Sequence, residues 1–237
     1  MNLPTADSLE GTGPRRSHRP LPRTTLRDAV AEEIRRRVFS AALPPGSRVD
    51  QEALAHDLGV SRVPVREALI TLHDEGIVEN IARRGAFVAL LSRLDIHDNY
   101  RILGMVSGLA AERAAGNLTA ADLARLRDLA DRMESSSAPV EQERLNFEFH
   151  ALINRAAGSR KLVSVLRMLV NAVPDTFYES HSEWPDKANH DHRRIIEMLA
   201  TGNSDGARRE IEQHFADGAD RAVASLEQRG FWSGVRA

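Results

Sequence analysis

Apolar residues recur with the spacing of an α-helix along most of this 237-residue chain, and one short stretch departs from that pattern. Between residues 76 and 90, two runs containing valine, isoleucine and phenylalanine flank the basic turn Arg83-Arg84-Gly85, which predicts a β-hairpin. The predicted fold class is therefore mainly α with one small hairpin. The length favours two compact units or one large one, and the hairpin marks the end of a small first unit.

Three helices are predicted ahead of the hairpin. Apolar residues at every fourth position from 26 to 38 predict the first. Asp50 is placed to cap a second helix, and Gly59 follows it where a left-handed C-cap is favoured. Ser61 is placed to cap a third helix, with Pro64 in its first turn. Two helices joined by a tight glycine turn and followed by a hairpin predict a winged helix-turn-helix.

The third helix has a basic flank. Its buried stripe consists of Val65, Ala68, Leu69 and Leu72. Arg62 and Arg66 lie one turn apart beside that stripe, together with His73. The planar fork of an arginine can bind guanine or grip a phosphate, so this flank suits a DNA groove. Two arginines at this spacing are also common on an ordinary solvated helix edge.

Several motifs in this region share their spacing with one known family. Leu43-Pro-Pro-Gly-Ser-Arg-Val-Asp, Leu58-Gly-Val-Ser-Arg-Val-Pro-Val-Arg-Glu-Ala-Leu and Arg84-Gly-Ala-Phe-Val resemble the DNA-binding domain of the GntR family of bacterial transcription regulators. The resemblance covers about residues 26 to 90. It implies that the chain binds double-stranded operator DNA.

The resemblance also implies which residues contact DNA. Operator bases and phosphates would be contacted by Ser61, Arg62 and Arg66. Gly85 at the wing tip would enter the minor groove beside Arg83 and Arg84. Val63 stands where the family usually has threonine or serine, so one hydroxyl contact to a phosphate is expected to be missing.

The remainder of the chain predicts an all-helical unit. It contains repeated stripes with a period of 3.6 residues and almost no alternation with a period of two. Six helices are expected, at 94–115, 119–134, 139–157, 159–182, 184–201 and 204–229. The predicted organisation is a flexible basic tail over 1–23, a winged helix-turn-helix domain over 24–91 and an all-α six-helix bundle over 95–230.

Polar residues on inward stripes mark a candidate site in the bundle. Asn146 and His150 lie at i and i+4, and His192 begins a stripe of buried positions while His190 points outward. His214 lies near the inward face of the last helix. Three imidazoles and one amide oxygen from three helices suit a divalent metal. A single inward histidine is, however, more often a hydrogen-bonded core residue.

Three segments of the bundle resemble a second family domain. Leu145-Asn-Phe-Glu-Phe-His, Asp191-His-Arg-Arg-Ile-Ile and Gly206-Ala-Arg-Arg-Glu-Ile-Glu-Gln-His-Phe look like the FCD ligand-binding domain of the FadR subfamily of GntR regulators. The resemblance implies a divalent metal, first zinc and otherwise nickel, manganese or iron, and a small carboxylate effector. The implied ligands are Asn146, His150, His192 and His214.

The FCD resemblance has two departures. Most such sites have an aspartate where this chain has Asn146, and a neutral amide lowers the negative charge offered to the metal. Arg101 matches a family arginine that reaches the effector carboxylate, but Met105 replaces the usual glutamate. Effector contacts on this helix are therefore expected to differ from those of the family.

Charge and composition limit the remaining classes. Residues 15–95 carry 14 arginines against 11 acids, while the whole chain has a net charge of −2. The absence of cysteine excludes disulfides, thiolate catalysis and cysteine-based zinc sites. The longest apolar run, 162–173, is broken by Arg167 and Asn171, so no membrane helix is expected. No export signal is evident, and a cytoplasmic protein is expected.

These observations predict a homodimeric transcriptional regulator, because operator symmetry and the resembling family both imply a dimer. The sequence leaves open whether it represses or activates. One rival is a metal-dependent enzyme, but Glu148 lies on the opposite side of its helix from His150 and offers no general base. A second rival is a helical adaptor whose first domain binds protein.

Overall fold

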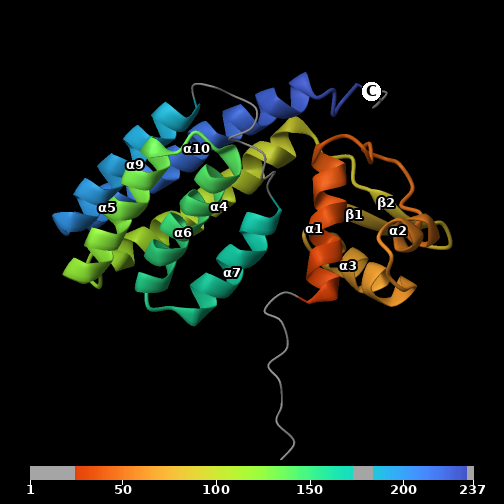
Figure 1. Cartoon of the computed structure of the whole chain (residues 1–237), viewed down its shortest axis with the longest axis horizontal. Coiled ribbons are helices and arrows are strands. Elements are labelled where there is room, and N and C mark those ends of the chain that lie inside the picture. Colours follow the sequence, from red (N-terminus) through yellow and green to blue (C-terminus); the bar gives the residue numbers. More distant parts are fainter. Residues whose placement is uncertain (1–24, 173–183, 234–237) are drawn as a thin grey trace, which may run out of the picture.

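The structure of the protein is a computed structural model, and the residues described are 25–172 and 184–233. Figure 1 shows two parts, a small head at the right and a larger helical body at the left. The predicted tail over 1–23 lies outside the described residues. Within the described part of the chain the fold is mainly α, with a two-stranded hairpin and no other paired strands. This confirms the predicted fold class.

The head is a winged helix-turn-helix. Its elements in chain order are α1 (Leu26–Phe39), α2 (Gln51–Asp57), α3 (Arg62–Asp74), β1 (Val78–Ile81) and β2 (Gly85–Val88). The two strands pair antiparallel, with Val78 opposite Val88. Asp50 caps α2 through its side chain, and Gly59 adopts a φ of +63° in the following turn. The tight turn between α2 and α3 therefore forms as predicted.

The start of α3 differs from the prediction in one detail. Ser61 occupies the N-cap position, but its side chain makes no capping hydrogen bond. Pro64 lies in the first turn of α3 and has no backbone N–H to satisfy, so one of the usual donors at this helix end is absent. The exposed hydroxyl of Ser61 is consequently not committed to the helix.

A buried ion pair fixes the base of α3 to α1. Arg35 Nη2 donates to both carboxylate oxygens of Glu75, at 3.1 and 2.8 Å, and the two side chains are only 5% and 3% exposed. Glu32 also contacts the guanidinium of Arg35. The two-pronged geometry satisfies both oxygens of a carboxylate that is withdrawn from water.

The body consists of helices only. Those that lie in the described part of the chain are α4 (Arg93–Ala114), α5 (Ala120–Ser135), α6 (Pro139–Ala156), α7 (Arg160–Asn171), α9 (Trp184–Ala200) and α10 (Ser204–Gln228). Capping boxes at Ser92 and Thr119 begin α4 and α5. Among residues 25–172 and 184–233, no helix combines the length and apolar character needed to cross a bilayer.

The helix predicted over 159–182 is shorter than expected. It ends at Asn171, where the N–H of Ala172 bonds to the carbonyl of Leu169 in a tightened last turn. Pro174 follows Ala172 two residues later, and the ring of a proline disfavours the helical conformation at the residue before it. Residues 173–183, including the predicted end of this helix, lie outside the described chain.

The longest contact in the body joins α4 to α10. The two helices approach too closely for larger side chains at two positions. A Cβ on Gly104 would lie 3.1 Å from the Cβ of Phe215, and one on Gly108 would lie only 2.9 Å from Glu212. Near the head, Tyr100 packs against Gly218. The glycine-rich run of α4 therefore serves close helix packing. Figure 1 shows α10 running along the body as far as the head.

Candidate nucleic-acid interface and metal centre

The third helix presents one face to the core and one to solvent. Val65, Ala68, Leu69 and Leu72 are buried against the rest of the head. Arg62 and Arg66 are exposed, as are Ser61 and Val63. Arg62 forms an ion pair with Glu52 at 2.6 Å, while Arg66 makes no ion pair with any described residue. Both guanidinium groups are therefore accessible to a partner outside the head.

The wing places its basic turn at the surface. Arg83 adopts a φ of +64° and Gly85 a φ of +100°, so the turn uses left-handed backbone that glycine tolerates best. Arg83, Arg84 and Gly85 are all exposed, and the guanidinium carbon of Arg84 lies 5.2 Å from the ring centre of Phe87. This cation–π contact holds one arginine of the wing against the hairpin.

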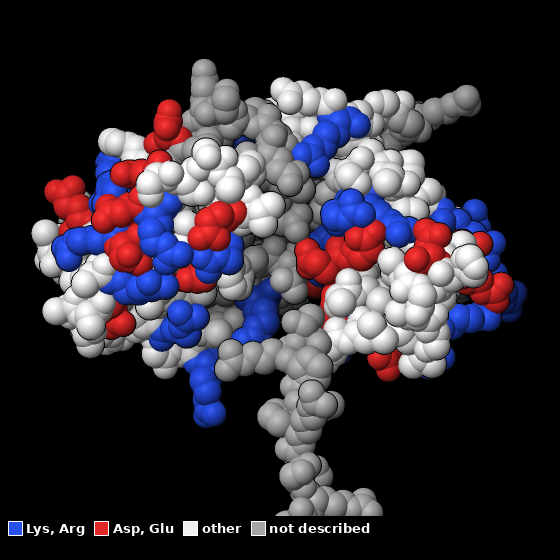
Figure 2. Space-filling model, in the orientation of Figure 1, with Lys and Arg blue, Asp and Glu red and all other residues white. Residues whose placement is uncertain are grey.

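The structure adds one arginine to this surface that sequence reasoning missed. Arg48 forms a β-bridge with Phe87, and its Nε would lie 3.8 Å from a Cβ at Gly85. It precedes Asp50 in a segment without helical or strand periodicity, so only the fold brings it to the hairpin. Figure 2 shows arginine side chains along the edge of the head that lies farthest from the body.

The body brings three predicted metal ligands together. His150 of α6, His192 of α9 and His214 of α10 each offer a ring nitrogen, and these atoms lie within 4.8 Å of one another. The ring centres are 5.4 Å apart for His150 and His192, 5.2 Å for His150 and His214, and 5.0 Å for His192 and His214. His190 is exposed, in agreement with its predicted outward direction. We call the three residues the histidine cluster.

Several buried polar atoms around the histidine cluster have no hydrogen-bond partner among the described residues. They are Asn146 Oδ1, His150 Nε2, and both Nδ1 and Nε2 of His192. Leaving one buried polar group unsatisfied costs about 1–3 kcal/mol, so four such atoms are unfavourable unless a ligand or water binds them. Neutral imidazole and amide groups are suitable ligands for a divalent transition metal. The residues present therefore fit a metal.

A carboxylate orients the third histidine. Asp191 Oδ2 lies 3.2 Å from His214 Nδ1 and also accepts a hydrogen bond from Lys187 at 2.9 Å. Such a carboxylate–histidine contact fixes the ring of a metal-binding histidine and raises its basicity. Sequence reasoning did not assign this role to Asp191, because the contact depends on how α9 packs against α10. Its position between two histidines was the available signal.

Burial keeps two imidazoles neutral. It holds the pKa of His150 well below the usual 6.5, and the neighbouring His214 lowers it further. Burial likewise lowers the pKa of His192, with further contributions from His214 and His150. Burial by itself would raise the pKa of Asp191, but hydrogen bonds with His214 and Lys187 outweigh it and lower the value. His150 and His192 therefore offer unprotonated imidazoles at neutral pH.

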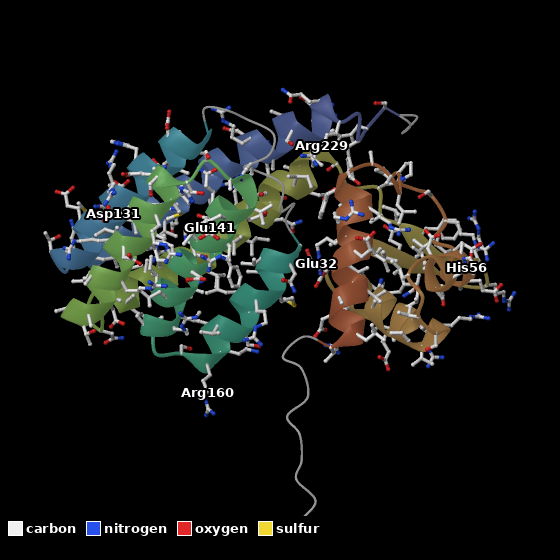
Figure 3. The ribbon with its side chains drawn as sticks, in the orientation of Figure 1. Glu32, His56, Asp131, Glu141, Arg160 and Arg229 are labelled. Carbon is white, nitrogen blue, oxygen red and sulfur yellow. The ribbon has the colours of Figure 1, made fainter. Side chains whose placement is uncertain are left out.

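Arg101 does not join the histidine cluster. It is exposed on α4, on the same side as Met105, whereas Leu103 and Ser107 face the interior. A surface hollow of about 510 Å³ lies elsewhere, at the corner between α6 and α7, and none of the predicted metal ligands lines it. Arg160, which helps to line this hollow, points away from the body in Figure 3.

Glu148, the acid two residues before His150, points away from the histidine cluster. Glu148 forms an ion pair with Arg125 at 3.3 Å and another with Arg144. A general base must lie within hydrogen-bond reach of the group that it deprotonates, and Glu148 is held on the outer side of α6. The geometry does not favour the enzyme alternative.

Two domain families match the chain. Residues 26–88 match the bacterial regulatory proteins of the gntR family, and residues 98–217 match the FCD domain. The first match covers the head, and the second covers the helices that carry the histidine cluster.

Individual relatives agree with these matches. The chain is 30% identical to the HTH-type transcriptional regulator Rv0043c of Mycobacterium tuberculosis over 68% of its own length and 66% of that protein. It is 22% identical to the HTH-type transcriptional repressor RspR of Escherichia coli over 89% of its own length and 95% of that protein. These relatives are regulators and not enzymes.

Solved structures show the same fold. McbR/YncC of E. coli superposes with a TM-score of 0.65 at 23% identity, over 86% of this chain and 98% of that one. A GntR regulator from Rhodococcus gives a TM-score of 0.55 at 22% identity, over 84% of this chain and 98% of the other. The domain matches, the relatives and the arrangement of head and body agree, and the chain belongs to the GntR family of DNA-binding transcriptional regulators, with an FCD domain as its body.

Proposed function

We propose that this protein is a homodimeric regulator whose two heads bind the half-sites of a palindromic operator, and whose body binds a small carboxylate at a divalent metal. The observation that carries this proposal is the separation of two different sites in one chain. Exposed arginines lie on the third helix of the head, and buried, unsatisfied imidazoles lie inside the body. Because its partner is chromosomal DNA, we place the protein in the cytoplasm.

In the head, we assign base and phosphate contacts to α3 and minor-groove contacts to the wing. The proposed DNA-contacting residues are Ser61, Arg62, Arg66, Arg83, Arg84 and Gly85. Arg66 is the leading candidate for a base contact because it is exposed and free of any described ion pair. Arg62 must exchange its ion pair with Glu52 for a phosphate or base, which costs little because both side chains are well solvated.

In the body, we assign the metal ligands to Asn146, His150, His192 and His214. Support comes from the convergence of the three imidazoles and from the unsatisfied oxygen of Asn146. When bound, the metal supplies open coordination positions that accept carboxylate oxygens. Asp191 holds the ring of His214, and burial keeps His150 and His192 unprotonated for ligation. Zinc is the first choice of metal, with nickel, manganese and iron as alternatives.

The effector is proposed to be a small carboxylate, with Arg101 as an additional contact carried over from the family. Arg101 is exposed on α4 and lies outside the histidine cluster, so this contact requires an effector that reaches beyond the cluster. The relative RspR is named a repressor, which favours repression for this chain as well. Effector binding changes DNA affinity only if the two states of the body bind the effector differently.

We propose that the dimer forms through the exposed side of α4. Ile102 is 47% exposed and Met105 is 59% exposed, although both are apolar. A second copy of the chain would cover these side chains and remove them from water. Met105→Glu is expected to shift the protein toward monomer in sedimentation velocity, whereas Arg209→Glu, at an exposed site on α10, is expected to leave the dimer intact.

The DNA-binding proposal is tested by selection. The full-length protein is mixed with a pool of random duplexes, bound DNA is amplified through several rounds, and the enriched sequence is titrated by fluorescence anisotropy. We expect a palindromic sequence whose affinity falls as salt rises, because neutralising phosphates releases counterions. Failure to enrich any sequence, together with no salt-dependent binding, would favour the adaptor alternative.

A further inference from the structure

The C-terminal end of α10 turns sharply back on itself. After the C-cap Arg229, Gly230 adopts a φ of +71° and donates its N–H to Glu227 O at 2.9 Å. The N–H of Phe231 bonds to Leu226 O at 3.0 Å. This pair of hydrogen bonds is the Schellman pattern, in which a left-handed residue ends a helix. It directs the side chain of Phe231 toward the head instead of letting the chain run on into solvent.

Phe231 is part of the core of the head. Its side chain is only 1% exposed and belongs to the apolar cluster that includes Val30 and Ile34 of α1. Its ring stacks near that of Phe39, the last residue of α1, with centres 6.3 Å apart and planes inclined by 27°. An aromatic residue just beyond α10 therefore completes the core of the DNA-binding domain. In Figure 3, Arg229 marks the place where α10 reaches the head.

Trp232 fixes the linker between the two parts. Its indole Nε1 donates to Leu91 O at 2.7 Å, and Leu91 lies between β2 and α4. The guanidinium carbon of Arg93 lies 4.6 Å from the tryptophan ring centre, and Arg93 Nε donates to Glu227 at 2.6 Å. The linker is thus held to the end of α10 by a hydrogen bond, a cation–π contact and an ion pair. We call residues 229–233 the C-terminal clasp.

A head joined to its body by one short linker can pivot about that linker, as hinge residues allow in other proteins. A second connection at a different point removes that freedom. In this chain the clasp supplies such a connection, because Phe231 enters the core of the head while Trp232 donates a hydrogen bond to the linker. It extends the contact that Ala222 and Leu226 of α10 make with the same apolar cluster. The orientation of the head is therefore defined by α10 as well as by the covalent link.

We propose that Phe231 and Trp232 are positioning residues for DNA binding, which fix the orientation of the head and thereby set the spacing between operator half-sites. The proposal rests on the proposed dimeric mode of DNA binding. In a dimer the two recognition helices must meet successive major grooves, about 10–10.5 base pairs apart or at a multiple of that distance. A head that is held at one angle accepts one spacing, whereas a pivoting head accepts several.

The clasp also lies on the helix that carries one member of the histidine cluster. His214 lies about 21 Å before the C-terminal end of α10, at a rise of 1.5 Å per residue. One continuous helix therefore connects the proposed metal centre to the clasp within each subunit.

The test measures spacing preference with the full-length protein. The selected operator is remade with two base pairs added to or removed from its centre, and each duplex is titrated by fluorescence anisotropy. For the wild type we expect the original spacing to bind about tenfold more tightly than either altered duplex. For Phe231→Ala we expect this ratio to fall to about threefold or less, with affinity for a single half-site unchanged.

Two variants control this experiment. Phe147→Ala removes another phenylalanine, one that is 61% exposed on α6, and is expected to keep the wild-type preference. Phe231→Leu keeps a large apolar side chain at this position and is expected to retain most of the wild-type spacing preference. If Phe231→Ala fails to fold by circular dichroism, Trp232→Phe provides a milder loss, because it removes the N–H donated to Leu91 and reduces the ring beside Arg93 while it keeps an aromatic side chain.

The outcomes separate the two proposals. A wild type that shows no spacing preference would overturn the dimeric mode of DNA binding. A wild type that shows the preference and a folded Phe231→Ala or Trp232→Phe that retains it in full would overturn the role of the clasp. Because the chain has no cysteine, a single label at Asn80→Cys gives an independent readout. We expect the distribution of label-to-label distances in the dimer to broaden in the clasp variants.

Discussion

The head and the body hold their functional side chains in opposite environments. The head exposes charged arginines on α3 and on the wing, where the local restraints are a solvated ion pair between Arg62 and Glu52 and the contact of Arg84 with Phe87. The body buries three imidazoles, two of which are kept neutral by desolvation. The exposed surface of the head is suited to a large anion, and the buried cluster of the body is suited to a small ligand that replaces water.

The two sites therefore respond to different solution conditions. Interactions at an exposed basic surface weaken as salt rises, because counterions screen them and compete for phosphates. A buried cluster is insensitive to salt and responds instead to protons and to chelators, which compete for the same ring nitrogens. Each prediction below tests one side of this comparison, and the expected effects decrease from the first to the last.

The largest effect is expected for the combined change His150→Ala and His192→Ala. Removing two of three converging imidazoles should abolish metal retention after dialysis, as measured by elemental analysis of the purified protein. The matched control is His190→Ala, because His190 lies on the same helix as His192 but is exposed. Full metal content in the double variant would remove this site from the proposal.

A smaller loss is expected for Arg66→Ala in the head. Binding to the selected operator should weaken by about 1–3 kcal/mol, because a base or phosphate contact is lost without unfolding the helix. Titration by gel shift measures the change. Arg209→Ala, which removes an exposed arginine from the body, is expected to bind like the wild type. An unchanged titration curve for Arg66→Ala would refute its assigned role.

The metal-free protein is expected to lose stability in mild acid. The pKa values of His150 and His192 in the folded state lie below the 6.5 of a free histidine, so below about pH 6.5 the unfolded chain binds protons that the folded chain excludes. The free energy of unfolding should fall by about 1.4 kcal/mol per pH unit for each such histidine.

Chemical denaturation in EDTA at pH 7.5, 6.5 and 5.5 measures this slope. His190→Ala should keep it, because both buried imidazoles remain in that variant. His192→Phe should reduce it, since one of the two buried imidazoles is gone. Equal stability of the metal-free wild type at all three pH values would contradict the prediction.

The smallest effect is expected for Glu52→Gln. This change releases Arg62 from its solvated ion pair, so stability should change by less than about 1 kcal/mol and operator affinity should rise slightly. Thermal melting and anisotropy at low and high salt measure both quantities. A tenfold loss of affinity would instead mean that the pair organises α3 for DNA.

The sequence predicts local structure well where a helix begins or ends at a clear signal. The expected helix over 139–157 is observed at Pro139–Ala156, and the Asp50 cap and Gly59 turn place α2 and α3 correctly. The helix expected to reach residue 182 ends at Asn171, because apolar periodicity does not report the tightened turn ahead of Pro174.

Contacts between distant segments are harder to predict. Periodicity indicates that His150, His192 and His214 face inward, but only packing brings them within 4.8 Å of one another and places Asp191 beside His214. The predicted end of the body at residue 230 left Phe231 outside it, although this side chain stacks near Phe39 at the far end of the sequence. Local patterns carry no information about such pairs.

The buried pair between Arg35 and Glu75 has a consequence for how the family can diverge. Truncating Arg35 alone would leave the carboxylate of Glu75 buried and uncompensated, and truncating Glu75 alone would leave Arg35 with the more exposed Glu32 as its partner, whereas replacing both by apolar residues of similar volume removes the buried charges. Evolution at these two positions should therefore proceed by coordinated substitution. Across an aligned set of heads, positions 35 and 75 are expected to be either both charged or both apolar, and rarely mixed.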